Sequence, residues 1–160
     1  GTAVQATDDC ERAGLFVPAL PPETRQRLDE FIPEVGSSSR NPVDSAVMMR
    51  PERIAQAIKV LSECPSINII MPIIRVEMMQ DFVGGERLEE MIKTILTSNK
   101  LSHKSLVVVA RTSISPRIHQ AAVDIQERCF KDNIPVYPTV ERAARSLYKF
   151  IQYHRQRKGR

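Results

Sequence analysis

Two apolar runs constrain the fold of this chain more than any other feature of its sequence. Residues 67–71 are apolar apart from Asn68, and residues 106–110 are apolar throughout. Strands buried on both faces have this pattern, and they occur mainly in parallel sheets that are covered by helices. Between the two runs, apolar residues recur at helical spacing over about 85–98. The order strand, helix, strand therefore predicts two parallel strands joined by a helical crossover.

The same alternation continues through the rest of the chain. Helical patterns are predicted over about 2–13 and 21–32 and from about 51, 116 and 140 onward, and short strands are predicted at 15–17 and 134–137. This order predicts a flavodoxin-like (Rossmann-type) three-layer α/β fold, a mostly parallel sheet with helices on both faces. Such folds begin with a strand, whereas this chain begins with a helix. The first strand is therefore expected to lie outside the sequence.

The net charge comes from the C-terminal end. The formal net charge is +4, and the last six residues, 155–160, contain four basic residues, so the rest of the chain is neutral. No basic stripe interleaved with aromatic residues occurs elsewhere, which argues against nucleic-acid binding. We expect one flavodoxin-like domain at 1–153, followed by a basic tail or linker to a following domain at 154–160.

The cysteines and the hydropathy pattern favour a cytoplasmic protein. Cys10, Cys64 and Cys129 are an odd number without a CxxC pair, which is typical of reduced, buried thiols. No apolar run approaches the roughly 18 residues of a membrane span, and no secretory leader pattern is visible. We expect neither a membrane partner nor a metal site, since no His or Cys ligand cluster is present.

Parallel sheets bind ligands beyond the carboxyl ends of their strands, and this rule selects five loops. They are residues 1–3, 40–45, 73–85, 111–115 and 137–139. Their helix starts, hydroxyl groups (Thr2, Thr112, Ser113, Ser115) and arginines (Arg40, Arg75, Arg111) suit a phosphate or a carboxylate. The alternative interpretation is that the hydroxyls cap helices and the arginines are solvated.

Other kinds of site have little support in the sequence. His103, His119 and His154 lie beside no Ser or Cys nucleophile, and none has a second ligand four residues away. Gly84-Gly85 does not form a GxGxxG loop after a strand. The rigid bend Asn41-Pro42-Val43-Asp44 is more informative, because it fixes the backbone and presents two short polar side chains.

Three segments together resemble one domain of a known family. They are residues 6–15 (ATDDCERAGL), the bend 41–44 (NPVD) and residues 133–143 (NIPVYPTVERA). In this order and spacing they are similar to the NDP-forming acyl-CoA synthetases, that is, the ADP-forming acetate–CoA ligases related to succinyl-CoA synthetase. The matching part is the second flavodoxin-like ligase domain, and the resemblance covers the chain to about Tyr153.

The resemblance implies that this domain takes part in a phosphoryl relay. Such enzymes convert a carboxylic acid, CoA and ATP to acyl-CoA, ADP and phosphate through a phosphohistidine on another domain. The whole enzyme would use ATP/ADP, Mg²⁺, CoA and phosphate, with CoA-binding, phosphohistidine and ATP-grasp domains or subunits as partners; a homo-oligomer is also compatible. This chain would contain no catalytic residue and bind no cofactor alone. The resemblance assigns phosphate and carboxylate binding to Gly1, Thr2, Ala3, Asn41, Asp44, Ile74 and Arg75.

Two other functions remain open at this point. The chain could be a non-catalytic regulatory or assembly module of a multidomain protein. It could also be a stand-alone flavin or nucleotide protein, although it has neither a phosphate loop nor Trp for stacking.

Overall fold

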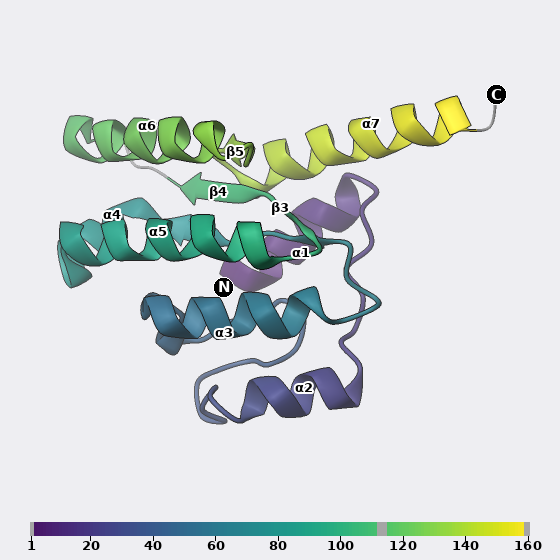
Figure 1. Ribbon diagram of the computed structural model, residues 1–160, viewed down its shortest axis with the longest axis horizontal. Coiled ribbons are helices and arrows are strands. Elements are labelled where there is room, and N and C mark those ends of the chain that lie inside the picture. Colours follow the sequence, from purple (N-terminus) through teal and green to yellow (C-terminus); the bar gives the residue numbers. More distant parts are fainter. Residues whose placement is uncertain (1, 112–114, 159–160) are drawn as a thin grey trace.

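The structure is a computed structural model that describes residues 2–111 and 115–158 (Figure 1). Gly1, Thr112 and Ser113, three of the candidate anion-facing residues, lie outside the described residues. The helices are α1 (Thr2–Arg12), α2 (Pro22–Asp29), η1 (Ala46–Met49), α3 (Pro51–Ser62), α4 (Val76–Met78), η2 (Met79–Val83), α5 (Gly85–Leu101), α6 (Pro116–Lys131) and α7 (Val140–Lys158). The strands are β1 (Ile69–Ile70), β2 (Ile73–Arg75), β3 (Ser105–Leu106), β4 (Val108–Arg111) and β5 (Val136–Tyr137).

Every pair of named strands is parallel, as the apolar runs predict. β1 pairs with β3, and β2, β4 and β5 form a sheet in that order. Pro72 separates β1 from β2 because it has no N–H to donate to the ladder. Its carbonyl still accepts from Val109 N at 2.9 Å, and the Ile70 carbonyl accepts from Val107 N at 3.0 Å. β1–β2 and β3–β4 are therefore two interrupted strands that lie side by side.

Alternate residues of these strands pack into two cores, one on each face of the sheet. Ile70, Ile74 and Val108 belong to the larger core, which contains the buried residues of α2, α3, α5 and α6. Val107 and Val109 point to the opposite face, where they pack with Ala6 of α1 and Ala143 of α7. Helices thus cover both faces, and the chain has the predicted three-layer α/β architecture.

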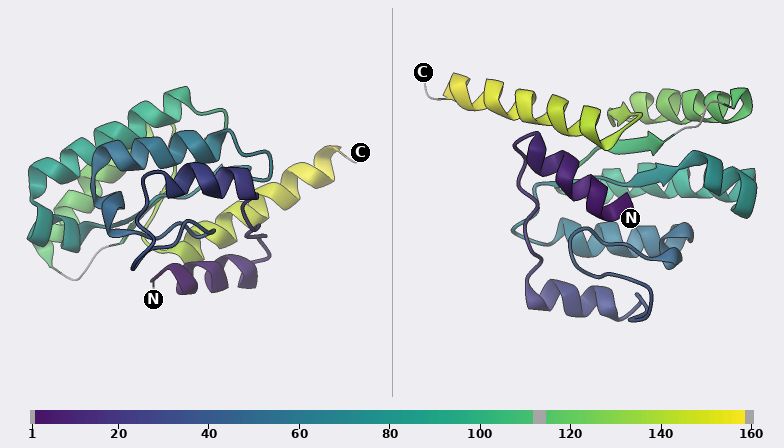
Figure 2. Two further views of the ribbon diagram at one scale, coloured as in Figure 1. Left: turned by 90° about the horizontal axis from the view of Figure 1, so that it is seen from below. Right: turned by 180° about the vertical axis from the view of Figure 1, so that it is seen from behind.

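Helix α1 ends in a glycine turn against α7. Gly14 has φ +93°, and Leu15 N donates to the Cys10 carbonyl at 3.0 Å, which is the long-range bond of a Schellman-type cap. The ring of Tyr148 on α7 lies over Gly14, leaving too little room for a Cβ atom there. The reverse view shows α1 beside α7, with the N-terminus of α1 toward the end of the sheet at which the strand arrows point (Figure 2).

Two expectations from the sequence are wrong. Leu15–Val17 forms no strand, because no neighbouring backbone pairs with it. Residues 73–85 are not a loop: they contain β2, α4 and η2, and Ile74, Val76 and Met79 pack in the larger core. The helix predicted from about residue 140 continues to Lys158 as α7. In the part of the chain that the structure describes, no helix is long and apolar enough to cross a membrane.

Candidate functional site

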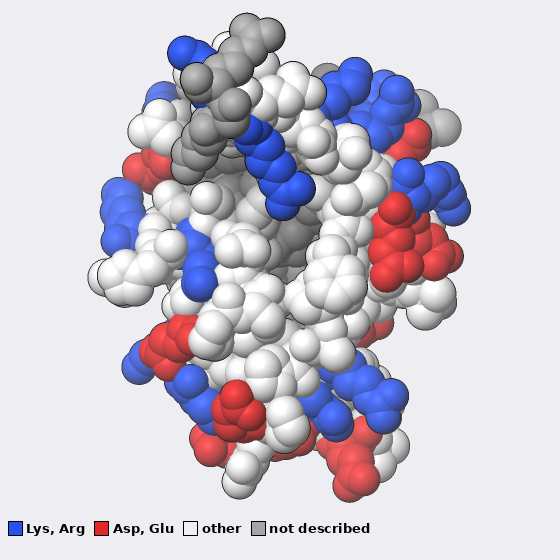
Figure 3. Space-filling view, turned by 90° about the vertical axis from the view of Figure 1, so that its right-hand side faces the viewer, with Lys and Arg blue, Asp and Glu red and all other residues white. Residues whose placement is uncertain are grey.

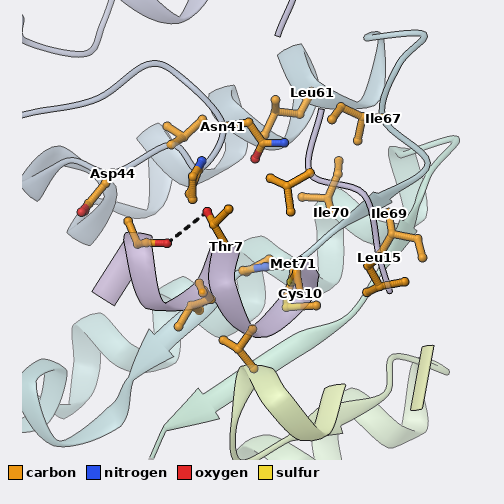
Figure 4. A pocket seen from close by; sticks show the side chains of 18 of the residues that line it. Thr7, Cys10, Leu15, Asn41, Asp44, Leu61, Ile67, Ile69, Ile70 and Met71 are labelled. Atoms are coloured by element: carbon orange, nitrogen blue, oxygen red, sulfur yellow. Dashed lines mark hydrogen bonds between the residues drawn. The ribbon is translucent and has the colours of Figure 1, made fainter. Parts of the chain in front are cut away.

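A cavity of about 1100 Å³ lies between α1, α3 and the edge of the sheet formed by residues 67–75. In the close view, Thr7 and Cys10 on α1 and Leu61 on α3 lie on opposite sides of this space (Figure 4). The lining includes six of the seven residues that the family resemblance selects. They are Thr2, Ala3, Asn41, Asp44, Ile74 and Arg75. Side chains separated by up to 73 positions in the sequence thus line one cavity.

The bend at residues 37–45 is held by its own hydrogen bonds. Ser38 and Asp44 pair through both backbone groups, at 2.6 and 2.9 Å, and form an isolated antiparallel bridge. The hydroxyls of Ser37 and Ser45 lie 2.8 Å apart, and the Ser45 hydroxyl also accepts from Val47 N at the start of η1. The bend is therefore a fixed wall of the cavity and not a flexible linker.

Asn41 attaches this bend to the segment after α1. Its Nδ2 donates to the Pro18 carbonyl at 3.0 Å, and the side chain is half-buried. The Asn41–Pro42 peptide bond is cis. Asp44 is exposed and carries a negative charge, which repels an anion. We therefore expect Asp44 to shape a phosphate site through its backbone, which is bridged to Ser38, more than through its carboxylate.

The start of α1 forms the second wall. Thr2 and Ala3 are half-buried and line the cavity. The first four N–H groups of a helix have no acceptor within the helix, and the helix dipole makes this end positive. The first turn of α1 contains no acidic residue that would neutralise this field. This end of α1 is therefore suited to an anion.

Two arginines stand at the carboxyl ends of neighbouring strands. Arg75 ends β2 and Arg111 ends β4, and the two residues are partners in the strand register. The Arg75 guanidinium is exposed and lies against the sulfur of Met78. Neither arginine forms an ion pair with a described residue. Two arginines at paired strand positions favour an anionic ligand at this edge, although only Arg75 lines the cavity.

Other candidates are placed differently from what the sequence suggested. The side chain of Ile74 is 3% exposed and lies in the larger core, and its strand position is paired with Ala110 of β4. Thr139 Oγ1 accepts from Arg142 N, so this hydroxyl caps α7. Sequence reasoning missed the link between Asn41 and Pro18, because nothing in either segment indicates a contact over 23 residues.

The thiols of Cys10 and Cys129 are poor nucleophiles. Burial raises the pKa of Cys129 to about 11, and burial followed by the carboxylates of Asp9 and Glu11 raises the pKa of Cys10. All three cysteines are free, and Cys64 is buried beside Ser66. Among residues 2–111 and 115–158, no cluster of three His, Cys, Asp or Glu side chains could hold a metal ion.

The chain is similar in sequence to known proteins. The chain is 26% identical to acetate–CoA ligase [ADP-forming] I of Archaeoglobus fulgidus, over 95% of the chain and 24% of the relative. It is 24% identical to acetate–CoA ligase [ADP-forming] II subunit alpha of Pyrococcus furiosus, over 95% of the chain and 31% of that subunit. The relatives of this chain are ADP-forming acetate–CoA ligases. No family model matches the sequence.

The fold of this chain also matches solved structures. A dinucleotide forming acetyl-coenzyme A synthetase 1 of Candidatus Korarchaeum cryptofilum, in complex with phosphate and ADP, matches with a TM-score of 0.75 and 23% identity. That match covers 99% of this chain and 32% of the synthetase. A crystal structure from Pyrococcus horikoshii also has a TM-score of 0.75, with 23% identity, over 92% of this chain and 32% of that one. The chain thus spans 24–32% of the length of these four proteins.

Proposed function

We propose that this chain is the second flavodoxin-like ligase domain of an ADP-forming acyl-CoA synthetase. In this proposal the whole enzyme joins a carboxylic acid to CoA, with ATP, Mg²⁺ and phosphate, through a phosphohistidine that another domain supplies. This domain binds the phosphate and carboxylate groups between the start of α1, the 37–45 bend and Arg75. It performs no covalent chemistry itself.

The observation that carries this proposal is the shared lining of one cavity. Thr2 and Ala3 at the start of α1, the Asn41–Asp44 bend and Arg75 all line it. Phosphoryl transfer needs fixed positive dipoles and guanidinium groups around the transferred group, and it needs little covalent help from the protein. Homology to ADP-forming acetate–CoA ligases supports the same assignment.

Replacing Arg75 in the full-length enzyme tests the role of this edge. The enzyme is first phosphorylated with radiolabelled ATP, and the loss of label from histidine is then followed after CoA and a carboxylic acid are added. We expect Arg75→Gln to slow this discharge by about 10²-fold, the magnitude found when a single charge-stabilising donor is removed. Phosphorylation by ATP should change little, because it takes place at another domain in this proposal.

Arg145→Gln is the matched control. Arg145 pairs with Glu141 on the exposed side of α7, where both side chains are more than half exposed, and it does not line the cavity. Discharge should stay at the parent rate in this variant. An Arg75→Gln enzyme that discharges at the parent rate would contradict the proposal. If that enzyme also showed altered subunit assembly, the assembly-module alternative would be favoured.

A further inference from the structure

The second half of α7 extends past the sheet and past the other helices (Figures 1 and 2). In the first half of α7, Val140 and Ala143 are buried in the core between α1 and the sheet, whereas none of residues 150–157 is buried. Helices in proteins gain most of their stability from packing one face against other elements. The second half of α7 has little such packing among the described residues, so a surface outside them is expected to cover it.

Four side chains form a continuous row on this part of α7. Phe150, Tyr153, His154 and Arg157 follow the spacing i, i+3, i+4 and i+7, which places them on one face of the helix, and we call them the α7 stripe. The ring centroid of His154 lies 4.4 Å from that of Phe150 and 5.4 Å from that of Tyr153. The Arg157 guanidinium lies 5.6 Å from the centroid of the Tyr153 ring. All four residues are exposed, and their mutual contacts hold them in a defined arrangement.

The residue types of the α7 stripe are those of protein–protein interfaces. Aromatic residues and Arg are enriched in the cores of interfaces and among the residues that contribute most to binding. Anchors at i, i+3, i+4 and i+7 are also the pattern by which a helix docks into an apolar groove of a partner. The stripe therefore fits a groove on another protein surface.

The charge of α7 indicates what surrounds this groove. Residues 142–158 contain six Lys or Arg and no Asp or Glu. With this end of the molecule toward the viewer, the space-filling view shows several Lys and Arg side chains in its upper part, where α7 lies (Figure 3). Partner surfaces are arranged so that opposite charges meet, and like charges suppress association. The groove that receives the stripe is therefore expected to have carboxylates at its edges.

Two other kinds of partner fit the stripe less well. The rings of Phe150 and Tyr153 meet the His154 ring at 59° and 85°, so the stripe has no row of parallel ring faces on which successive bases of a nucleic acid would stack. A helix that lies on a membrane needs a wide apolar face. The stripe has only two aromatic residues, and His154 and Arg157 lie on the same face.

We propose that the α7 stripe docks into an apolar groove, edged by carboxylates, on another domain or subunit of the same enzyme. The existence of the docking face is argued from α7 alone, and the identity of the partner rests on the proposed function. Because this chain matches 24–32% of the length of the similar proteins, the rest of such an enzyme is large enough to supply the groove.

Hydroxyl-radical footprinting with mass spectrometry tests this proposal on the full-length enzyme and on the 160-residue chain. The oxidation rates of Phe150 and Tyr153 are compared between the two proteins. In the chain alone these side chains are 62% and 55% exposed, and in a docked stripe they would be about 10% exposed or less, as in an interface core. We therefore expect both residues to be oxidised about five-fold more slowly in the full-length enzyme.

A charge reversal within the stripe tests the acidic edge of the groove. Arg157→Glu in the full-length enzyme should raise both oxidation rates to those of the isolated chain, because it places a carboxylate against other carboxylates. Arg145→Glu is the matched control, since it makes the same charge change on the same helix at a residue outside the stripe that pairs with Glu141. The protection should persist in this control. Protection that also persists in Arg157→Glu would overturn the proposed acidic groove.

Three further outcomes would overturn the proposal. The first is an equal oxidation rate of the stripe in the chain and in the full-length enzyme. The second is protection of the isolated chain that grows with its concentration, which would make a second copy the occupant. The third is protection that appears only after oligo(dT) or phosphatidylserine vesicles are added, which would make nucleic acid or a membrane the partner.

The footprint does not depend on phosphoryl transfer, so it separates this inference from the proposed function. A protected stripe together with discharge at the parent rate in Arg75→Gln would contradict only the proposed role of the anion site. An unprotected stripe together with slowed discharge in Arg75→Gln would contradict only the docking of α7.

Discussion

Gly14→Ala should be one of the most damaging small substitutions in this protein. Gly14 adopts φ +93°, where a Cβ atom costs about 1–2 kcal/mol. A Cβ built there would lie 2.6 Å from Tyr148 Cε2 and 3.0 Å from Tyr148 Cδ2. Overpacking of this kind costs about 1–3 kcal/mol, and the lower unfolded-state entropy of Ala returns about 0.4–1 kcal/mol. We therefore expect the free energy of unfolding to fall by about 2–4 kcal/mol.

Gly36→Ala is the matched control, because it isolates the backbone effect. Gly36 has φ +70°, and no atom lies within 4 Å of a Cβ built there. Its cost should be about 1 kcal/mol or less. Urea denaturation followed by circular dichroism measures both variants, with the m-value as a check on two-state unfolding.

A double-mutant cycle separates the contact from the strain. Tyr148→Ala removes the ring that meets the new Cβ, so Gly14→Ala should cost about 1–3 kcal/mol less in the Tyr148→Ala background. Two results would refute the reasoning. One is a Gly14→Ala cost no larger than that of Gly36→Ala, and the other is additivity of the two substitutions. Either would mean that α1 and α7 do not meet at this turn as closely as the structure shows.

Two further predictions follow from the thiols and from the proposed function. Burial raises the pKa of the Cys129 thiol from 9.0 to about 11. As the pH rises, the thiol therefore loses its proton in the unfolded chain before it does so in the folded protein. The stability that the protonated thiol contributes is present below pH 9 and is lost as the pH rises through 11. The difference in unfolding free energy between the parent and Cys129→Ala, measured by urea denaturation, should therefore shrink by about 2–3 kcal/mol between pH 9 and pH 11, and a constant difference would contradict the assignment. The isolated 160-residue chain mixed with ATP, Mg²⁺, CoA and acetate should form no acyl-CoA above background in a chromatographic assay, and turnover would show that this chain contains more of the active site than we propose.

Much of the candidate site could be predicted from local sequence. The strand–helix alternation indicates which segments end at the carboxyl edge of the sheet, and the family resemblance selects Asn41 and Arg75 within them. Both residues line the cavity. Ile74 shows the limit of this reasoning, since its neighbour Arg75 is exposed while its own side chain lies in the core. The alternation of a strand decides which of two adjacent residues faces solvent, and that depends on where the strand begins.

The sequence alone determines the local elements of this protein, because helical and strand periodicities depend on residues a few positions apart. It predicts the buried parallel strands on either side of α5. Only the tertiary structure decides how these elements pair. It breaks the first apolar strand at Pro72, leaves Leu15–Val17 without a partner, and joins Asn41 to Pro18 across the cavity wall. The physical reason is that a strand, unlike a helix, forms its hydrogen bonds with another segment, so its existence depends on whether a neighbour is present.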